Sequence, residues 1–436
     1  MEVKPFRAFR FDKAIVGDVD SCIAPPYDVI GKARQCRLYE KNQYNIVRII
    51  KGKTSTSDSD TDNQYTRAAD YLNTWIGKGI LKQDLGEAIY TYVQDFELAG
   101  SRFQRSSFIA LGKLEEFGKT VKPHEQTLSE PKIDRLNLQR ATAAKFGLIL
   151  MLYKDEKKIA EKISENASDQ KPLIEFVDEE NVRHRLFAIT EKDHIEAIAK
   201  MMIDKSCIIA DGHHRYETAL NYSKETANPA AKYQMAAFCN ICQEGLVVLA
   251  THRLVSNLEK FSFSELIAKM RENFEIMEYL FPSPSTKCDA RQKMLLQMKA
   301  EHARGKNAFG IYAGSDTFYT AVLKDKRTMD SVAADKSCAF RSLDVAVLHK
   351  MILEKFLGID EEKLAAGSNL EYVKDTENAI DESIASVDAG QKQIAFFMNP
   401  PTTEQIKMVT DEGERMPQKS TFFYPKVHTG LTINKL

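Results

Sequence analysis

The sequence lacks an apolar run that could cross a membrane. Its longest strongly apolar stretch, "FGLILMLY" at 146–153, is far shorter than the roughly 20 residues that a spanning helix needs. The stretch "MEVKPFRAFRFDK" has no signal-peptide core. The chain also has almost no net charge, since its 61 basic and 62 acidic side chains leave a formal charge of only -1. We therefore expect a cytoplasmic protein that binds neither membrane nor nucleic acid, in which any anion site is local.

Cysteines are few and scattered. The seven are odd in number, which argues against a disulfide framework and favours a reducing compartment. Cys239 and Cys242 form one C-x-x-C pair, but a second such pair or a histidine pair at matching spacing is missing. Two buried thiols on a strand or helix are therefore favoured over a zinc site.

Several familiar catalytic motifs are absent as well. The sequence contains no G-x-x-x-x-G-K-[ST] loop, no G-x-G-x-x-G turn and no G-x-S-x-G elbow. The stretch "HEQTL" at 124–128 lacks the second histidine of a zinc-protease helix. Any phosphate or substrate site must be built in another way.

What is present is a mixture of strand and helix patterns over the whole chain. Apolar and polar residues alternate on both sides of a turn at 88–114 and again at 308–324, which predicts two β-hairpins. Helical spacing occurs at 65–79, 193–204, 263–274 and 343–358. With 43% apolar residues and 436 positions, the chain can bury several cores. We expect an α/β or α+β protein with a mixed, partly antiparallel sheet.

The most informative stretch is "CIIADGHHRYETAL" at 207–220. It predicts a buried strand, a tight Asp211-Gly212 turn and a helix that begins with His213, His214 and Arg215. A helix N-terminus favours anions through its backbone N–H groups and dipole, and an arginine adds a bidentate contact to phosphate. Gly212 would let the backbone approach the ligand closely. The pattern predicts a phosphate site.

A purely structural interpretation of the same stretch stays open. Histidines near helix starts are often hydrogen-bonded structural residues, and Arg215 could pair with Glu217 or another carboxylate. Adjacent histidines on a helix point in different directions, so a zinc site is disfavoured.

A second group of polar residues lies at 121–141. His124 and Glu125 follow a proline that would end a strand, and Asp134, Arg135 and Arg140 lie on an expected helix. A carboxylate beside a histidine suits a general base if it faces the phosphate site, whereas a surface loop is the structural alternative.

Three further stretches carry polar groups that also have structural explanations. "APPYDVI" at 24–30 is a stiff loop that could present Tyr27 and Asp28, and "THRLV" at 251–255 puts His252 and Arg253 at the end of an apolar strand. "MPQKSTFFYPK" at 416–426 carries Lys419, Ser420, Thr421 and Lys426.

Taken in order, these stretches resemble the domain-of-unknown-function 1015 family over nearly the whole chain: "PPYDVI", "HEQT" with "DR", "ADGHHRYETAL", "GLVVLATHRLV" and "PQKSTFFYPK". The pair "KPHE" (122–125) and "DGHHR" (211–215) also looks like the two signature stretches of the ParB/sulfiredoxin superfamily, which includes free-serine kinases. Members of that superfamily bind nucleotide phosphates at the start of a helix. The interval between the two stretches is longer here, which implies insertions.

The second resemblance implies specific roles. It assigns the phosphates to Gly212, His213, His214 and Arg215, a place near metal or substrate to Asp211, and the general base to Glu125. Sulfiredoxin-type members carry a reactive cysteine at the position of His213, so sulfinic-acid reduction is not expected here. His213 could instead form a phosphohistidine intermediate. Weaker substrate contacts are expected from the following residues: His124, Thr127, Arg135, His252, Arg253 and Lys419.

The resemblance thus predicts a nucleotide-dependent phosphotransferase that acts on free serine or phosphoserine, with Mg²⁺ at Asp211 and ATP or ADP as cofactors. A phosphoserine phosphatase and a non-catalytic nucleotide-binding regulatory protein are the alternatives. We expect a ParB/sulfiredoxin-like core at 121–255 between added α/β segments at 1–120 and 256–436. The expected partners are the small-molecule substrate and the nucleotide, and assembly as a homo-oligomer is left open.

Overall fold

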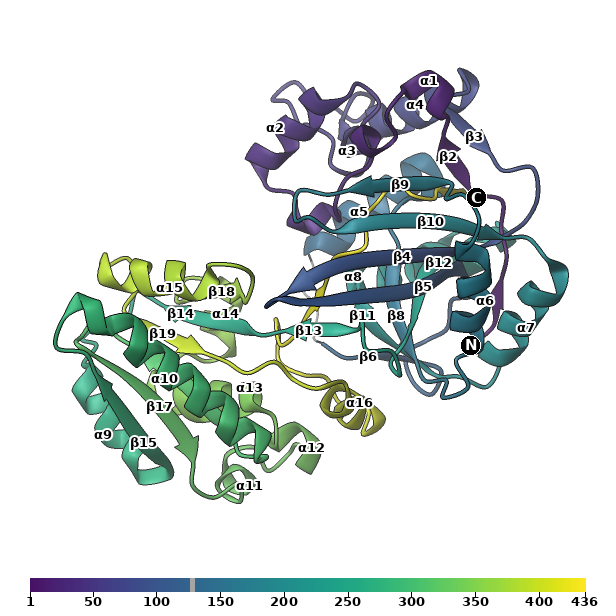
Figure 1. The fold of residues 1–436 in the computed structure, drawn as a ribbon. Coiled ribbons are helices and arrows are strands. Elements are labelled where there is room, and N and C mark those ends of the chain that lie inside the picture. Colours follow the sequence, from purple (N-terminus) through teal and green to yellow (C-terminus); the bar gives the residue numbers. More distant parts are fainter. Residues whose placement is uncertain (126–129) are drawn as a thin grey trace. The chain divides into compact units, whose positions relative to one another are not determined.

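The computed structural model describes residues 1–125 and 130–436, which form two compact units (Figure 1). The first unit contains residues 1–123, 130–247 and 425–436 of this range, so the C-terminal segment belongs to it. The second contains residues 124–125 and 248–424. Each unit has its own sheet and its own core.

The first unit is built on a nine-stranded sheet in which β6, β11, β8, β12, β5, β4, β10 and β9 follow one another and β1 pairs with β5. Its strands are β1 (Val3–Lys4), β4 (Ile89–Leu98), β5 (Ser101–Lys113), β6 (Val121–Pro123), β8 (Ile149–Tyr153), β9 (Ile174–Val177), β10 (Arg183–Ile189), β11 (Cys207–Asp211) and β12 (Tyr233–Asn240). Two pairs, β6 with β11 and β8 with β12, are parallel, and the others are antiparallel. Two short strand pairs lie outside this sheet: β2 (Phe9–Phe11) with β3 (Leu81–Gln83), and β7 (Ala144–Lys145) with β21 (Asn434–Lys435).

The helices of the first unit are α1 (Lys13–Val16), η1 (Asp20–Cys22), η2 (Tyr27–Val29), α2 (Lys32–Lys41), α3 (Val47–Ile50), α4 (Gln64–Gly77), α5 (Glu130–Thr142), α6 (Ile159–Ser168), α7 (Lys192–Met202), α8 (His213–Glu225) and η3 (Pro229–Lys232). Those labelled η are short 3-10 turns.

The two faces of this sheet differ, because side chains alternate along each strand. On one face, Ile89 and Val93 of β4 and Phe108 of β5 form a core with apolar residues of α6, α7 and α8. The opposite face carries polar side chains, among them Gln94 and Arg105, that bond to the C-terminal segment. Gln94 Nε2 donates to the Lys426 carbonyl at 3.0 Å, and Arg105 donates to the Pro425 carbonyl. The segment runs along this unit in yellow in Figure 1.

The second unit has a six-stranded antiparallel sheet in the order β15, β17, β16, β19, β14, β18. Its strands are β14 (Thr251–Val255), β15 (Phe274–Leu280), β16 (Ala308–Tyr312), β17 (Thr317–Leu323), β18 (Leu370–Lys374) and β19 (Ile394–Phe397), and a separate pair joins β13 (Val247–Leu249) to β20 (Phe422–Tyr424). Its helices are α9 (Phe263–Asn273), α10 (Pro284–Ala303), α11 (Thr328–Val332), α12 (Cys338–Arg341), α13 (Asp344–Val347) with its π-helical continuation η4 (Leu348–Phe356), α14 (Glu361–Ala366), α15 (Ala379–Asp388) and α16 (Thr403–Asp411). Buried residues of α10 and α15 pack on the sheet.

The structure confirms the predicted α/β class with a mixed sheet and the two predicted hairpins. The first hairpin is β4–β5, whose turn residues Ala99 and Gly100 have φ of 49° and 77°, and the second is β16–β17. The four predicted helices are observed as α4, α7, α9 and the pair α13–η4. The division into segments at residues 120 and 255 stays a prediction about domains.

The described residues contain no helix with the length and apolar character that a membrane span requires. All seven cysteines are free thiols. The expectation of two buried thiols at Cys239 and Cys242 is correct only for Cys239, which is buried in β12; Cys242 lies in the turn after that strand and is half-buried.

Candidate phosphate site

The strand, turn and helix predicted at 207–225 are observed. Strand β11 ends at Asp211, and Gly212 has φ 94° and ψ 31°, the left-handed conformation that glycine adopts without steric cost. Helix α8 then begins at His213 and ends at Glu225. Gly212, the residue before the helix, has no side chain that could cap it. The helix therefore keeps the positive end of its dipole at this point.

Asp211 lies between two cationic side chains. Lys426 Nζ lies 2.6 Å from its Oδ1, and Arg215 Nη2 lies 2.5 Å from its Oδ2. Burial alone would raise the pKa of Asp211, but the charges of Lys426 and Arg215 outweigh it and hold the pKa well below its usual range. Asp211 is therefore ionised, and it links α8 to the C-terminal segment.

Arg215 has a fixed position over the turn. Besides its bond to Asp211, the guanidinium donates to the carbonyl of Leu148. A Cβ placed on Gly212 would lie 2.9 Å from the Arg215 Cζ, and one placed on Gly147 would lie 3.3 Å from its Cδ. The glycine at 212 thus gives room to the Arg215 side chain, whereas the sequence suggested room for a ligand. The carboxylate partner left open by the sequence is Asp211, while Glu217 pairs with Lys132 at 2.7 Å.

A cavity of about 60 Å³ lies beside Arg215 in the first unit. Since one water needs roughly 10 to 15 Å³ of such space, the cavity has room for about four to six waters, or for a small anion of similar size. Arg215 and Thr218, one turn apart on α8, line one side of it. The other residues that line it are Tyr27, Ile50, Arg135, Leu138, Gln139, Ala144, Lys145, Phe146, Gly147, Gln234 and Thr429.

Two further cations line this cavity. Arg135 lies 4.1 Å from the centre of the Tyr27 ring, and it donates to the carbonyl of Ile50 at 2.7 Å and to Asp134 Oδ2 at 2.9 Å. Lys145 is 4% exposed and donates to the carbonyls of Ala231 and Tyr233. Burial lowers the pKa of Lys145 to about 7, so part of its charge is lost at neutral pH.

A larger basic groove of about 620 Å³ shares Arg135 with the cavity. Its lining includes Lys32, Lys51 and Lys53, and Lys51 Nζ lies 5.8 Å from the Tyr27 ring centre. This volume falls within the range of roughly 300 to 1,000 Å³ that small-molecule sites occupy. The first unit therefore offers a small basic cavity next to a groove large enough for an organic ligand.

Several of the other predicted site residues lie in the second unit. There, Glu125 accepts a hydrogen bond from the backbone N–H of Lys419, and the Lys419 carbonyl accepts one from Arg253 Nη2 at 3.0 Å. His124 is buried, with its Nε2 3.7 Å from Glu125 Oε2 and 2.7 Å from Thr421 Oγ1. His124, Glu125, Arg253 and Lys419 therefore form one cluster within this unit.

His252 is held apart from this cluster by other partners. Its Nδ1 accepts from the Met398 N–H at 3.2 Å, and its Nε2 lies 3.3 Å from Asp375 Oδ1. Thr127 lies outside the described residues. The functional roles of all these residues stay predictions.

The surroundings of Asp211 do not fit the predicted Mg²⁺. Each carboxylate oxygen already faces a cationic nitrogen within 2.6 Å, so a divalent cation would lie beside two positive charges.

Lys145 was not among the sequence-based candidates, and Tyr27 and Lys426 were named there without a role at the phosphate site. Tyr27 and Lys426 lie in stretches that the sequence had marked as polar and structural. The only signal in the sequence that could have pointed to Lys145 was its position directly before the apolar run 146–153.

Comparison with known proteins gives a family and distant structural similarities. A free serine kinase in complex with AMP has a TM-score of 0.35 and 13% identity, over 70% of this chain and 83% of that one. SbnI with a C-terminal truncation from Staphylococcus aureus has a TM-score of 0.36 and 10% identity, over 75% and 87%. A conserved hypothetical protein from Pyrococcus furiosus has a TM-score of 0.33 and 12% identity, over 70% and 87%.

No curated protein sequence matches the chain significantly. The model of the family described as "Protein of unknown function (DUF1015)" matches residues 3–346, which is most of the sequence. This match confirms the first resemblance, and the chain belongs to the DUF1015 family.

Proposed function

We propose that this chain binds the phosphates of a nucleotide at the cavity beside Arg215 and transfers a phosphoryl group to free serine. The observation that carries the proposal is the pair of arginines, Arg215 and Arg135, that line the cavity with their guanidinium groups fixed by backbone carbonyls. Preorganised guanidinium groups bind phosphate oxygens strongly because little side-chain entropy is lost on binding.

The rest of the first unit supports a nucleotide in particular. The N-terminus of α8 adds a positive dipole end close to Arg215, and the basic groove that shares Arg135 gives space for the remainder of a nucleotide. Lysines 32, 51 and 53 would place positive charge along that groove.

The chemistry proposed is a single phosphoryl transfer. A bond forms between the serine Oγ and the terminal phosphorus, the phosphoanhydride bond of the nucleotide breaks, and the serine proton passes to a carboxylate. We propose Glu125 as the carboxylate that accepts this proton, because the stretch "KPHE" at 122–125 resembles the superfamily signature that supplies the general base. Asp211 is the weaker candidate, since two cations lower its pKa and make it a poor base.

The test measures binding and turnover on the same preparations of the full chain. Arg215→Ala should weaken binding of ATP or ADP about 10- to 100-fold in calorimetry, because a charge-assisted contact worth roughly 1.5 to 3 kcal/mol is lost. Arg140→Ala is the matched control, since Arg140 is exposed and pairs with Glu225 at 2.8 Å. Unchanged nucleotide affinity in a folded Arg215→Ala variant would show that the cavity is not the phosphate site.

Turnover is followed by phosphorus NMR with serine, phosphoserine and a nucleotide panel, with and without Mg²⁺. Glu125→Gln should lower the rate about 10²- to 10⁴-fold while nucleotide affinity changes little. Release of inorganic phosphate from phosphoserine without nucleotide would identify a phosphatase. Nucleotide binding with no transfer to any acceptor would identify a regulatory protein and contradict the kinase proposal.

A further inference from the structure

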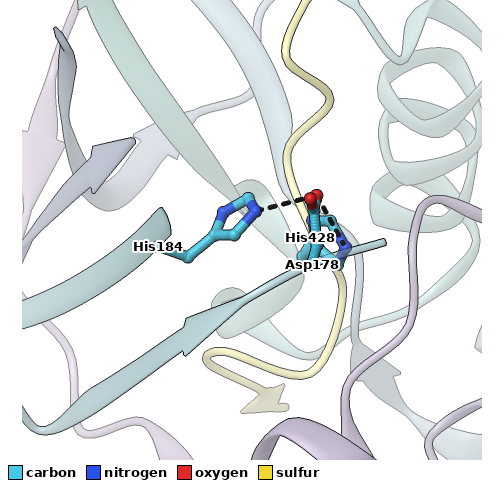
Figure 2. A group of neighbouring side chains, drawn as sticks. All are labelled: Asp178, His184 and His428. Carbon is cyan, nitrogen blue, oxygen red and sulfur yellow. Dashed lines mark hydrogen bonds and ion pairs between the residues drawn. The ribbon is translucent and has the colours of Figure 1, made fainter. Parts of the chain in front are cut away.

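A buried cluster of two histidines and a carboxylate lies in the first unit, outside the phosphate site. Asp178 follows β9, His184 is on β10, and His428 is in the C-terminal segment. Their potential ligand atoms all lie within 4.8 Å of one another. Figure 2 shows the Asp178 carboxylate linked to both imidazole rings. Asp178 Oδ2 lies 3.0 Å from the Nε2 of His184 and 3.8 Å from the Nε2 of His428.

The Asp178 carboxylate is oriented by its own turn. Its Oδ1 accepts hydrogen bonds from the backbone N–H groups of Glu180 and Val182, each at 2.9 Å. These two bonds leave Oδ2 directed at the histidines. Carboxylates that bind metals are usually held in place by hydrogen bonds from neighbouring groups. The Asp178 carboxylate is held in this way through Oδ1, while Oδ2 faces the two imidazoles.

The His184 ring is oriented in the same way. Its Nδ1 lies 2.6 Å from the Tyr92 hydroxyl, and the Phe176 ring stacks on it with centroids 4.5 Å apart. Gln94 Nε2, which can only donate, lies 3.5 Å from the same Nδ1. Metal binding at Nε2 requires the tautomer with the proton on Nδ1, which would donate to Tyr92 and leave the Nε2 lone pair on the side of Asp178. A hydrogen bond to one ring nitrogen is the common way in which proteins orient a histidine that binds a metal through the other.

His428 contacts the other two members of the cluster without a hydrogen bond to either of them. Its side chain is 10% exposed, and within the described residues its Nδ1 is buried with no hydrogen-bond partner. Its Nε2 is 3.8 Å from Asp178, too far for a hydrogen bond. The backbone of Lys426 acts as a hydrogen-bond partner of the ring, but no hydrogen bond joins His428 to Asp178. A further group between the ring and the carboxylate would therefore bind both of them.

We propose that Asp178, His184 and His428 bind one divalent transition-metal ion, with Zn²⁺ the best match. Ligand atoms about 2.0 to 2.1 Å from a tetrahedral zinc lie about 3.4 Å from each other, and the two observed separations of 3.0 and 3.8 Å lie on either side of that value. Two imidazoles and a carboxylate suit zinc and related ions, whereas Mg²⁺ prefers oxygen ligands alone.

The ion would have a structural role. It would join the C-terminal segment, through His428, to the β9–β10 hairpin, through Asp178 and His184, and so hold together parts of the chain that are far apart in sequence. Three protein ligands leave one tetrahedral position for a water molecule. This site shares no residue with the phosphate site, although Thr429, which follows His428, lines the cavity there.

The experiment uses the full chain, produced without a histidine tag, stripped with a chelator and then dialysed against Zn²⁺ or Co²⁺. We expect one equivalent of bound metal by mass spectrometry of the elements, visible absorption of tetrahedral Co²⁺, and a melting temperature that rises on adding Zn²⁺. Hydrogen exchange in residues 425–436 should slow when the metal is bound.

Loss of a residue that only orients a metal ligand weakens metal binding about 10- to 100-fold, and we expect this effect from Tyr92→Phe. Loss of a ligand itself should have a larger effect, and this is expected for each of the variants Asp178→Asn, His184→Gln and His428→Gln. His194→Gln is the control, since this histidine lies on α7 and is half-buried, with 39% of its side chain exposed. The proposal is wrong if the reloaded parent chain binds neither ion, or if folded His428→Gln retains the metal content and the Zn²⁺-dependent melting shift of His194→Gln.

Discussion

At the scale of single residues, the first unit contains charged groups whose state is set by burial and by neighbours. Asp211 stays ionised because two cations face it, while Lys145 donates to two backbone carbonyls and loses part of its charge. Both groups belong to the same small region, yet their pKa values shift downward for opposite reasons: opposite charge in one case and desolvation in the other.

The lowered pKa of Lys145 predicts a pH dependence of stability. The pKa is about 7 in the folded chain and 10.5 in the unfolded chain, so between these values the unfolded state binds more protons. The free energy of unfolding should therefore rise with pH across this window, with a contribution of up to about 1.4 kcal/mol per pH unit.

The measurement compares denaturant unfolding of the parent and of Lys145→Met at several pH values from 7 to 9.5. Subtracting the two curves removes the contributions of the other titrating groups, so the difference isolates Lys145. A parent stability that shows the same pH slope as Lys145→Met would contradict the lowered pKa.

At the scale of elements, the junction of β11 with α8 couples backbone conformation to the position of Arg215. Gly212 has a positive φ, and its missing Cβ leaves room for the guanidinium that pairs with Asp211. The sequence predicted this strand, turn and helix because all three signals are local: an apolar run, an Asp-Gly pair and a helical pattern. Arg215 occupies the space beside Gly212 because of its side-chain rotamer, and sequence patterns do not specify rotamers.

Gly212→Ala should therefore have two effects. The positive φ of 94° should cost about 1 to 2 kcal/mol of stability, and the new Cβ, 2.9 Å from Arg215 Cζ, should displace the guanidinium and weaken binding of phosphate ligands. Gly17→Ala is the control for strain alone, because Gly17 has φ 74° and no atom within 4 Å of an added Cβ.

Thermal or denaturant unfolding together with phosphate calorimetry on both variants separates these effects. Both variants should lose stability, and only Gly212→Ala should lose affinity. Equal phosphate affinity in the two variants would mean that the position of Arg215 does not control anion binding.

At the scale of the whole molecule, the decisive contacts join residues that are distant in sequence. Hairpins such as β4–β5 follow from alternation within one short stretch, so the sequence predicted them correctly. Lys426 reaches Asp211 across 215 positions, and His428 meets Asp178 and His184 in the same way. No periodicity encodes such pairs, because they depend on the path of the C-terminal segment along the first unit.

Because of that path, residues 425–436 are essential to the first unit. The rest of that unit ends at Val247, more than 170 positions earlier in the sequence. Val427, Leu431 and Ile433 are buried, and burying three such side chains contributes about 5 to 9 kcal/mol at roughly 1.5 to 3 kcal/mol each. This is comparable with the 5 to 15 kcal/mol that typically separates a folded domain from its unfolded state. Arg105, itself fully buried, would also lose the Pro425 carbonyl that accepts its hydrogen bond.

Deleting residues 425–436 should therefore unfold or severely loosen the first unit, whereas the sheet of the second unit should keep its own core. Hydrogen exchange followed by mass spectrometry tests this directly: peptides from β4, β5 and β10 should lose protection, and peptides from β16 and β17 should keep it. Removal of only Lys435 and Leu436 is the control, since it spares the three buried apolar side chains and the Lys426 ion pair. If the shortened chain protects β4 and β5 as well as the parent does, the C-terminal segment is an accessory to the first unit and not part of its core.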